Sequence, residues 1–279
     1  MTIALTPVPT IPLANGVAMP RIGLGTWPMR GQEAAEAVRS ALEIGYRLID
    51  TAENYGNEDA VGEGMRASGL KREDIFLTTK FNRAHHSVGG VREACEASLA
   101  RLGTDYIDLF LIHWPNPDQD RYVEAFEGLQ RVLEAGLVRA IGTSNFKPAH
   151  LEKLFAAGMV PHLNQVQLDP FHPRADVLAV HQARGIVTEA WGPIGRGSDL
   201  LDAPSITAIA QEHGVTPSQV VLRWHLQSDY VTVPKSASPQ RQAENLDILG
   251  FALSDEEMAQ LNSLGRPDPD MLDSDSFGH

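Results

Sequence analysis

Four side chains in the first half of the sequence have the chemical types needed to deliver a proton: Asp50, Tyr55, Lys80 and His113. A phenol is a weak acid with an ordinary pKa of about 10. A nearby ammonium group favours the phenolate, so Lys80 is expected to lower the pKa of Tyr55 by roughly 1–3 pH units. A carboxylate at Asp50 would keep Lys80 charged, and His113 could donate a hydrogen bond to an oxygen that gains negative charge. Together they would make Tyr55 a general acid.

Each of these residues also has a purely structural interpretation. Asp50 could cap the turn that follows it, Tyr55 could pack against its neighbours, and Lys80 could be a charge at the start of a helix. His113 could be a buried histidine with satisfied hydrogen bonds. Their positions after three successive predicted strands favour the chemical interpretation, because chance does not readily gather these four types at neighbouring strand ends.

Short apolar strands alternate with helical segments along the chain. Asn15-Gly16, between two apolar segments, predicts a two-residue β-hairpin. Eight strand–helix units follow at a spacing of roughly 30 residues, the size of one βα unit. Their strands are continuous apolar runs, as expected when both faces of a parallel sheet are covered. The pattern predicts one domain over 1–279, a (β/α)8 TIM barrel with an N-terminal hairpin and extra C-terminal helices.

Two features near the C-terminus complete this prediction. Ser254 and Glu257 form a predicted capping box at the start of the last helix. The tail 265–279 is rich in proline and aspartate, and it is either loose or draped over the domain.

Bulk composition bounds the function. The formal net charge is -13 and no cluster of lysine and arginine opposes it, which argues against a nucleic-acid partner. Cys95 is the only cysteine, so no intrachain disulfide is expected. The first residues lack a basic segment and a long apolar run, so neither a signal peptide nor a membrane span is expected. We therefore expect a cytoplasmic protein, a monomer, with a small-molecule substrate and no metal.

In a TIM barrel the carboxyl ends of the strands carry the functional residues. Besides the four residues above, polar or aromatic side chains follow most of the other predicted strands. They are Trp114, Ser144, Asn145, Gln165, Gln167, Trp191, Lys235 and Ser236.

Several longer motifs resemble those of the aldo-keto reductase superfamily, and they occur in the family's order. They are GYRLIDTAENYGNE at 45–58, LFLIHWP at 109–115, LEAGLVRAIGTSNF at 133–146 and VPKSASPQRQAEN at 233–245. The resemblance runs from Ile11 to about Leu264. It implies a carbonyl reductase whose catalytic tetrad is Asp50, Tyr55, Lys80 and His113, with Tyr55 as the acid.

The resemblance also implies NADPH, bound in an extended form across the barrel mouth. No Rossmann fingerprint is present, since GLGTWP and GRGSDL both lack the third glycine. From the residues themselves, Lys235, Ser236, Ser238 and Arg241 concentrate two cations and two hydroxyls where a strand meets a helix. Helix N-termini and arginine both bind phosphate. This cluster suits the 2′-phosphate of NADPH better than the diol of NADH, although a capped helix with solvated charges would look the same.

Family positions assign further residues to the cofactor and the substrate. The nicotinamide amide would contact Ser144, Asn145 and Gln165, and its ring would stack on Trp191, where many members have tyrosine. The rest of the cofactor would contact Gly192, Ile194, Val233, Lys235, Ser236, Ala237, Ser238, Arg241, Glu244 and Asn245. The substrate would contact Trp27, Phe81, His113 and Trp114.

The motifs WGPIGRG and VLRWHLQ are most similar to a bacterial branch that includes 2,5-diketo-gluconate reductase and methylglyoxal reductase. We therefore expect reduction of small aldehydes, ketones and especially α-dicarbonyls such as methylglyoxal. A neighbouring carbonyl makes the attacked carbon more electrophilic, which points the same way. The physiological substrate and the direction of the reaction in the cell stay open.

Three alternatives remain. The chain could be a non-catalytic, NADPH-binding regulatory barrel of the same family, which the complete tetrad disfavours. It could be a metal-dependent hydrolase that uses Asp50 and His113, which the shortage of further ligands at the strand ends disfavours. It could also be a Schiff-base aldolase at Lys80, which requires a lysine without charge.

Overall fold

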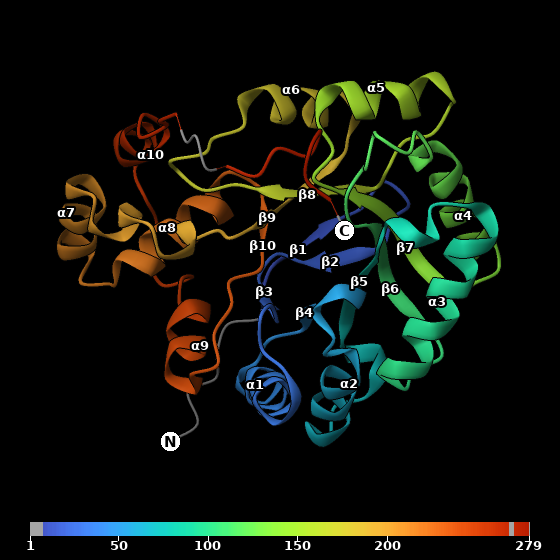
Figure 1. Cartoon of the computed structure of the whole chain (residues 1–279). Helices are drawn as coiled ribbons and strands as arrows, with labels where there is room; N and C mark the ends of the chain where they lie inside the picture. Colours follow the sequence, from blue (N-terminus) through green and yellow to red (C-terminus); the bar gives the residue numbers. More distant parts are fainter. Residues whose placement is uncertain (1–7, 268–270, 279) are drawn as a thin grey trace.

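The structure is a computed structural model that describes residues 8–267 and 271–278. Eight parallel strands follow one another in chain order around a barrel (Figure 1). The strands are β3 (Gly23–Gly25), β4 (Leu48–Asp50), β5 (Phe76–Phe81), β6 (Ile107–Ile112), β7 (Val138–Ser144), β8 (Leu163–Gln167), β9 (Val187–Trp191) and β10 (Val231–Thr232). Parallel bridges from Ile22 to Thr232 and from Gly25 to Lys235 join the last strand to the first. The predicted TIM-barrel fold is confirmed.

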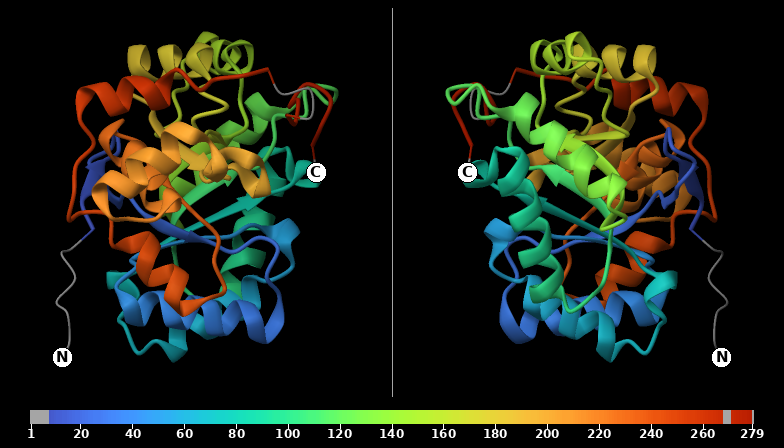
Figure 2. Two further views of the ribbon diagram at one scale, coloured as in Figure 1. Left: turned by 90° about the vertical axis from the view of Figure 1, so that its left-hand side faces the viewer. Right: turned by 90° about the vertical axis from the view of Figure 1, so that its right-hand side faces the viewer.

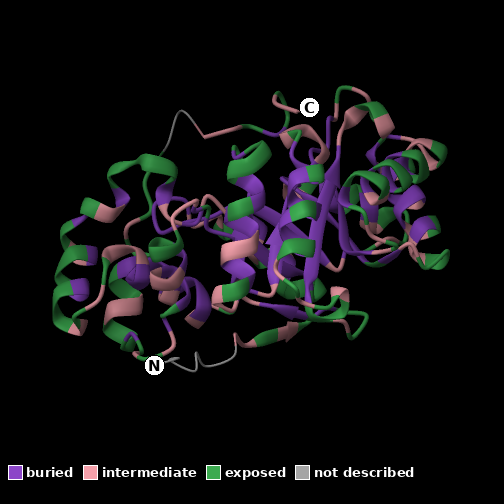
Figure 3. Cartoon of the chain, turned by 90° about the horizontal axis from the view of Figure 1, so that it is seen from below, coloured by how far each residue is buried: buried purple, intermediate pink, exposed green. Residues whose placement is uncertain are grey.

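Helices cover the outside of the barrel, and their outer faces are exposed while the strands are buried (Figure 3). Two helices rather than one, α7 and α8, connect β9 to β10, and α10 follows the last βα unit. The helices are α1 (Gly31–Ile44), α2 (Glu58–Ala67), α3 (Val88–Leu102), α4 (Tyr122–Glu134), α5 (Pro148–Ala156), α6 (Ala175–Arg184), α7 (Pro204–His213), α8 (Pro217–Gln227), α9 (Pro239–Leu246) and α10 (Asp255–Asn262).

Alternation along the strands divides the apolar residues into two cores, because successive side chains point to opposite faces. On β6, Phe110 and Ile112 pack outward with the helices. Leu109 and Leu111 point into the barrel and form a second cluster. Position 142 on β7 requires glycine, since a Cβ atom would lie 2.4 Å from the carbonyl oxygen of Leu163.

The N-terminal hairpin, β1 (Thr10–Pro12) and β2 (Ala18–Pro20), closes the barrel at the amino ends of the strands. Its Leu13 and Met19 belong to the interior cluster. In the side views the hairpin lies at one end of the molecule and the C-terminus at the opposite end (Figure 2). The predicted two-residue turn is wrong: Leu13 and Val17 are hydrogen-bonded across a three-residue loop that ends at Gly16 (φ 84°). The extra residue forms a bulge, which a glycine in the left-handed region permits.

Two smaller expectations can also be compared with the structure. The capping box of Ser254 and Glu257 is present at the start of α10. Within residues 8–267 and 271–278, no helix combines the length and the apolar character needed to cross a bilayer. The expectation about a signal peptide rests on residues 1–16, of which 1–7 lie outside the described residues.

Candidate active site

A cleft of about 740 Å³ opens at the carboxyl ends of the barrel strands. Three of the four predicted catalytic residues, Asp50, Tyr55 and His113, line it. Lys80 lies behind them and is fully buried. The cleft therefore brings together residues that are separated by up to 63 positions in the sequence, from Asp50 to His113.

Lys80 connects the phenol to the carboxylate. Its Nζ lies 2.7 Å from Asp50 Oδ1, 2.9 Å from the carbonyl oxygen of Thr51 and 3.4 Å from the Tyr55 hydroxyl. Local structure explains the position of Tyr55. The chain leaves β4 at Asp50, and the 3-10 helix Glu53–Tyr55 carries the phenol back over the ends of β4 and β5. Gly56, with φ at 60°, ends this turn.

The charge state of the pair follows from its surroundings. Burial alone would lower the pKa of Lys80, but Asp50 and Tyr55 raise it, and the net pKa lies above the ordinary value. Lys80 therefore remains an ammonium, as the sequence predicts. A lysine held in this state is a poor Schiff-base nucleophile, which counts further against the aldolase alternative.

The predicted lowering of the Tyr55 pKa is wrong. Burial raises the pKa of the phenol and outweighs the lowering effect of Lys80, while Asp50 raises it further. The prediction considered only the nearest positive charge, whereas desolvation penalises the phenolate more strongly. Tyr55 is consequently protonated at neutral pH, which is the form that a proton donor requires.

His113 stands at the end of β6 and completes the tetrad. Its ring centroid is 5.7 Å from that of Tyr55, in an edge-to-face arrangement. The Asn145 side chain donates a 3.1 Å hydrogen bond to the His113 carbonyl oxygen, which holds this strand end against the next one. The imidazole and the phenol thus border the same part of the cleft.

The residues predicted to contact the nicotinamide form a connected group at the ends of β7, β8 and β9. Gln165 Nε2 donates to Asp50 Oδ2 at 2.8 Å, so this group is joined to the tetrad. Asn145, in the left-handed region at φ 65°, donates to Ser144 Oγ at 3.0 Å and accepts from Trp191 Nε1 at 2.8 Å. These bonds fix the half-buried indole of Trp191 at the wall of the cleft.

The predicted phosphate site lies where β10 meets α9. Lys235 and Arg241 are exposed, and neither forms an ion pair with any described residue. Ser238 caps α9 by accepting from the Arg241 backbone nitrogen, and it also bonds to Ser236. Two exposed cations beside a helix N-terminus fit a phosphate group, so these residues suit the 2′-phosphate of NADPH.

Only part of the predicted cofactor set lines the cleft itself. The lining members, besides those of the nicotinamide group, are Gly192, Ile194, Val233 and Lys235. The others lie outside the cleft, along the segment that leads into α9 and within that helix: Ser236, Ala237, Ser238, Arg241, Glu244 and Asn245. An extended cofactor would have to reach from the cleft to the start of α9 to contact both groups.

Arg196 is a cleft residue that the sequence analysis missed. Its guanidinium carbon lies 5.1 Å from the ring centroid of Trp191 and 5.8 Å from that of Trp27. The backbone of Arg196 is left-handed, with φ at 50°, between two glycines. An arginine inside a glycine-rich loop directly after a barrel strand was the available signal.

Three of the residues predicted to contact the substrate, His113 among them, border the cleft, and one does not. Trp27, 53% exposed, and the buried Trp114 both line the cleft. The prediction for Phe81 is wrong, because this residue is fully buried and packs on Phe110 at 5.1 Å in the outer core. Side chains alternate along β5, so the inward direction of Lys80 sends Phe81 outward.

The C-terminal segment also contributes to the wall of the cleft. Leu272 and Phe277 line the cleft, and the Phe277 ring lies 4.7 Å from that of Trp114. Ion pairs hold the segment to the residue before α5, since Lys147 contacts Asp273 and Asp275. The described part of the tail, 271–278, is therefore draped over the barrel mouth.

Comparisons with known proteins agree with this geometry. The profile of the aldo/keto reductase family matches residues 21–266. The chain is 45% identical to morphine 6-dehydrogenase of Pseudomonas putida, over 96% of this chain and 97% of that protein. It is 44% identical to 2,5-diketo-D-gluconic acid reductase B of a Corynebacterium species, over 92% and 93% of the two chains.

Solved structures extend the comparison. A Gox0644 mutant crystallised in complex with NADPH has a TM-score of 0.92 and 39% identity, with 99% of both chains covered. The Bombyx mori aldo-keto reductase in complex with NADP has a TM-score of 0.87 and 34% identity, over 93% and 94% of the chains. The chain belongs to the aldo/keto reductase family. This confirms the predicted family and enzyme class, and the NADPH prediction agrees with these complexes.

Proposed function

We propose that this protein reduces small aldehydes, ketones and especially α-dicarbonyls to alcohols with NADPH, and that Asp50, Tyr55, Lys80 and His113 are its catalytic residues. The observation that carries this proposal is the Tyr55 hydroxyl, which borders the cleft 3.4 Å from the Lys80 ammonium. Bound NADPH supplies the hydride that the carbonyl carbon accepts.

The chain's own residues handle the proton. Tyr55 donates its phenolic proton to the carbonyl oxygen of the substrate, and the O–H bond of the phenol breaks. The phenolate that remains is stabilised by Lys80, which Asp50 holds at 2.7 Å. His113 donates a hydrogen bond to the same carbonyl oxygen as negative charge develops there. Tyr55 then recovers a proton from solvent.

The cofactor has a matching set of contacts along the mouth. Ser144, Asn145 and Gln165 provide amide and hydroxyl groups for the nicotinamide, and the Trp191 indole provides a stacking surface. At the other end, Lys235 and Arg241, which pair with no described carboxylate, offer two cations for the 2′-phosphate. Held by these residues, the nicotinamide would lie beside Tyr55, and the substrate would contact Trp27 and Trp114.

The substrate class rests on the walls of the cleft and on one relative. Trp27, Trp114 and Phe277 make a largely aromatic wall, which favours flat or compact carbonyl compounds over long polar ones. The relative from Corynebacterium is named for a diketo acid. A second carbonyl next to the attacked carbon increases its electrophilicity, so dicarbonyls should react fastest.

A substrate panel tests the proposal. We expect the rate of NADPH oxidation to give a kcat/KM for phenylglyoxal or methylglyoxal at least about 10²-fold above that for xylose, roughly 2.7 kcal/mol of transition-state stabilisation. Comparable values would contradict the dicarbonyl preference and leave the reductase proposal standing. Absence of NADPH oxidation with every carbonyl would favour the non-catalytic NADPH-binding barrel instead.

A further inference from the structure

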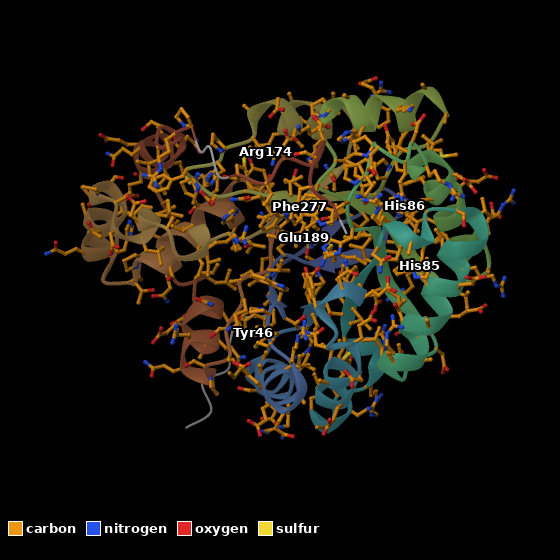
Figure 4. All side chains as sticks on the ribbon, viewed as in Figure 1. Tyr46, His85, His86, Arg174, Glu189 and Phe277 are labelled. Atoms are coloured by element: carbon orange, nitrogen blue, oxygen red, sulfur yellow. The ribbon has the colours of Figure 1, made fainter. Side chains whose placement is uncertain are left out.

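Glu189 is a second carboxyl group inside the barrel that the proposed reaction does not use. It lies on β9 and is fully buried near the centre of the molecule (Figure 4). Val187 belongs to the interior apolar cluster and Trp191 lines the cleft, so Glu189, between them in the alternation, also faces the interior. On the neighbouring strand β8, Gln165 is its register partner.

The Glu189 carboxyl forms no ion pair with any described residue, and Gln165 offers it at most a weak interaction. Neither of its oxygens has a hydrogen-bond partner among the described residues. The amide nitrogen of Gln165, opposite it, donates to Asp50 instead. The Lys80 ammonium is likewise directed at Asp50, the Thr51 carbonyl and Tyr55. An ionised carboxylate in this position would be desolvated without a partner, and such groups take up a proton instead.

Elsewhere the chain does pair its buried carboxylates. Glu58, 2% exposed on α2, lies 2.6 Å from Arg101 and accepts a 2.6 Å hydrogen bond from the Thr79 hydroxyl. Asp108, also buried, contacts both Arg72 and Arg139. Glu189 differs from both because no arginine adjoins it among the described residues. This contrast identifies it as a site where a neutral acid is accommodated.

The groups that face Glu189 come from four elements. Asp50 is on β4, Lys80 on β5, Gln165 on β8 and Tyr55 in the turn after β4, while β10 contributes the apolar Val231. Burial raises the pKa of Glu189 and Asp50 adds to the rise, whereas Gln165 and Lys80 offset part of it, giving about 8. A negative charge on Glu189 in turn raises the pKa of Tyr55.

Resting on the reaction proposed above, we propose that Glu189 is a proton-bearing positioning residue that acts through Tyr55 and Lys80. When Glu189 is neutral, Lys80 interacts with the single negative charge of Asp50, so the ammonium can stabilise the phenolate that forms on Tyr55. In its ionised form it adds a second negative charge to the same interior and opposes release of the proton. Ionisation of Glu189 therefore lowers the rate of carbonyl reduction at alkaline pH.

Glu189→Gln tests this idea, because glutamine matches the neutral acid in shape and cannot ionise. The matched control is Glu58→Gln, which changes a buried glutamate that is paired. The measurement is kcat for phenylglyoxal reduction with NADPH from pH 6 to 9.5. We expect the kcat of Glu189→Gln, divided by that of wild type, to increase by several-fold to about tenfold as the pH rises past about 8. The same kcat ratio for Glu58→Gln should not change with pH. A flat ratio for Glu189→Gln overturns the proposal.

Thermal unfolding provides a readout that does not depend on activity. A carboxyl group whose pKa is raised by folding binds more protons in the native state than in the unfolded state. Its contribution to stability is therefore present below the unfolded pKa and is lost as the pH rises toward about 8. We expect the Tm of Glu189→Gln, relative to that of wild type, to increase as the pH is raised from 5 to 8. The Tm of Glu58→Gln should be lower than that of wild type.

The outcomes separate the two proposals. If the wild type oxidises no NADPH, the proposed reaction fails and so does the role assigned to Glu189 in it, while the Tm comparison still decides its charge state. If the wild type is active but Glu189→Gln loses Tm as Glu58→Gln does, only the Glu189 proposal fails. Glu189→Leu is a second neutral variant; if neither variant folds at pH 7, the site requires a charge and the proposal is overturned.

Discussion

The two ends of the barrel interior are built from the same strands but have opposite character. At the amino ends, Leu48, Leu109 and Leu163 pack with Leu13 and Met19 of the hairpin in a dry apolar layer. Nearer the carboxyl ends, inward positions on four of the strands are polar. They are Asp50 on β4, Lys80 on β5, Gln165 on β8 and Glu189 on β9.

This difference separates stability from chemistry along the strands. The apolar layer stabilises the fold through burial and tight packing. The polar layer removes charged groups from water, which disfavours folding unless each charge has a partner. Lys80 and Asp50 form an ion pair with each other, whereas Glu189 forms none with the described residues. Substitutions at the amino ends should therefore change stability, and substitutions at the carboxyl ends should change catalysis or cofactor binding.

The largest expected effect is at the mouth. Tyr55→Phe should lower kcat by about 10²–10⁴-fold, because it removes the proton donor. NADPH affinity should stay nearly unchanged, because the hydroxyl belongs to the catalytic group rather than to the cofactor contacts. Fluorescence titration with NADPH and initial rates measure the two quantities.

Tyr46→Phe is the matched control for this prediction. The buried Tyr46 hydroxyl donates to the Gln242 carbonyl oxygen, and Tyr46 is not among the residues that line the cleft. Its loss should cost about 0.5–1.5 kcal/mol of stability and leave kcat intact. Retention of more than about a tenth of wild-type kcat by Tyr55→Phe would remove Tyr55 from the role of acid.

The next effect is at the opposite end of the barrel. Leu109→Ala should lower the free energy of unfolding by about 2–5 kcal/mol, because it leaves a cavity in the closed apolar layer. The kcat of the folded protein should be unchanged. Urea unfolding followed by tryptophan fluorescence gives the first value. The exposed Val160 serves as control, and Val160→Ala should stay within about 0.5 kcal/mol of wild type. A large fall in kcat for Leu109→Ala would contradict the separation of the two ends.

The smallest of the three effects concerns the cofactor. Arg241→Ala should weaken NADPH binding by roughly 10- to 150-fold, on the order of 1.5–3 kcal/mol, because it removes a charge-assisted contact to the 2′-phosphate. NADH lacks this phosphate, so its affinity should change much less. Arg39→Ala, on the outer face of α1, should affect neither cofactor. Equal losses for NADPH and NADH would mean that Arg241 contacts another part of the cofactor.

Much of the fold was predictable because its signals are local. The apolar runs of the strands and the helices between them appear in consecutive residues, and so does the Ser254–Glu257 cap. The tetrad was identifiable because Asp50, Lys80 and His113 end successive strands. The prediction for Phe81 failed for a local reason as well, since only the alternation along β5 distinguishes its direction from that of Lys80.

The sequence by itself determined the barrel, the family and the residues at the ends of its strands, because periodicity and motif order need no knowledge of distant contacts. Only the tertiary structure decided the charge states of Tyr55 and Glu189 and which segment covers the cleft. Whether burial or Lys80 dominates the pKa of Tyr55 depends on atoms from several strands. The weak pairing of the Glu189 carboxyl depends on Gln165, whose amide donates its hydrogen bond to Asp50. The contact of Phe277 with Trp114 joins residues 163 positions apart, 277 minus 114, and no local pattern encodes such a contact.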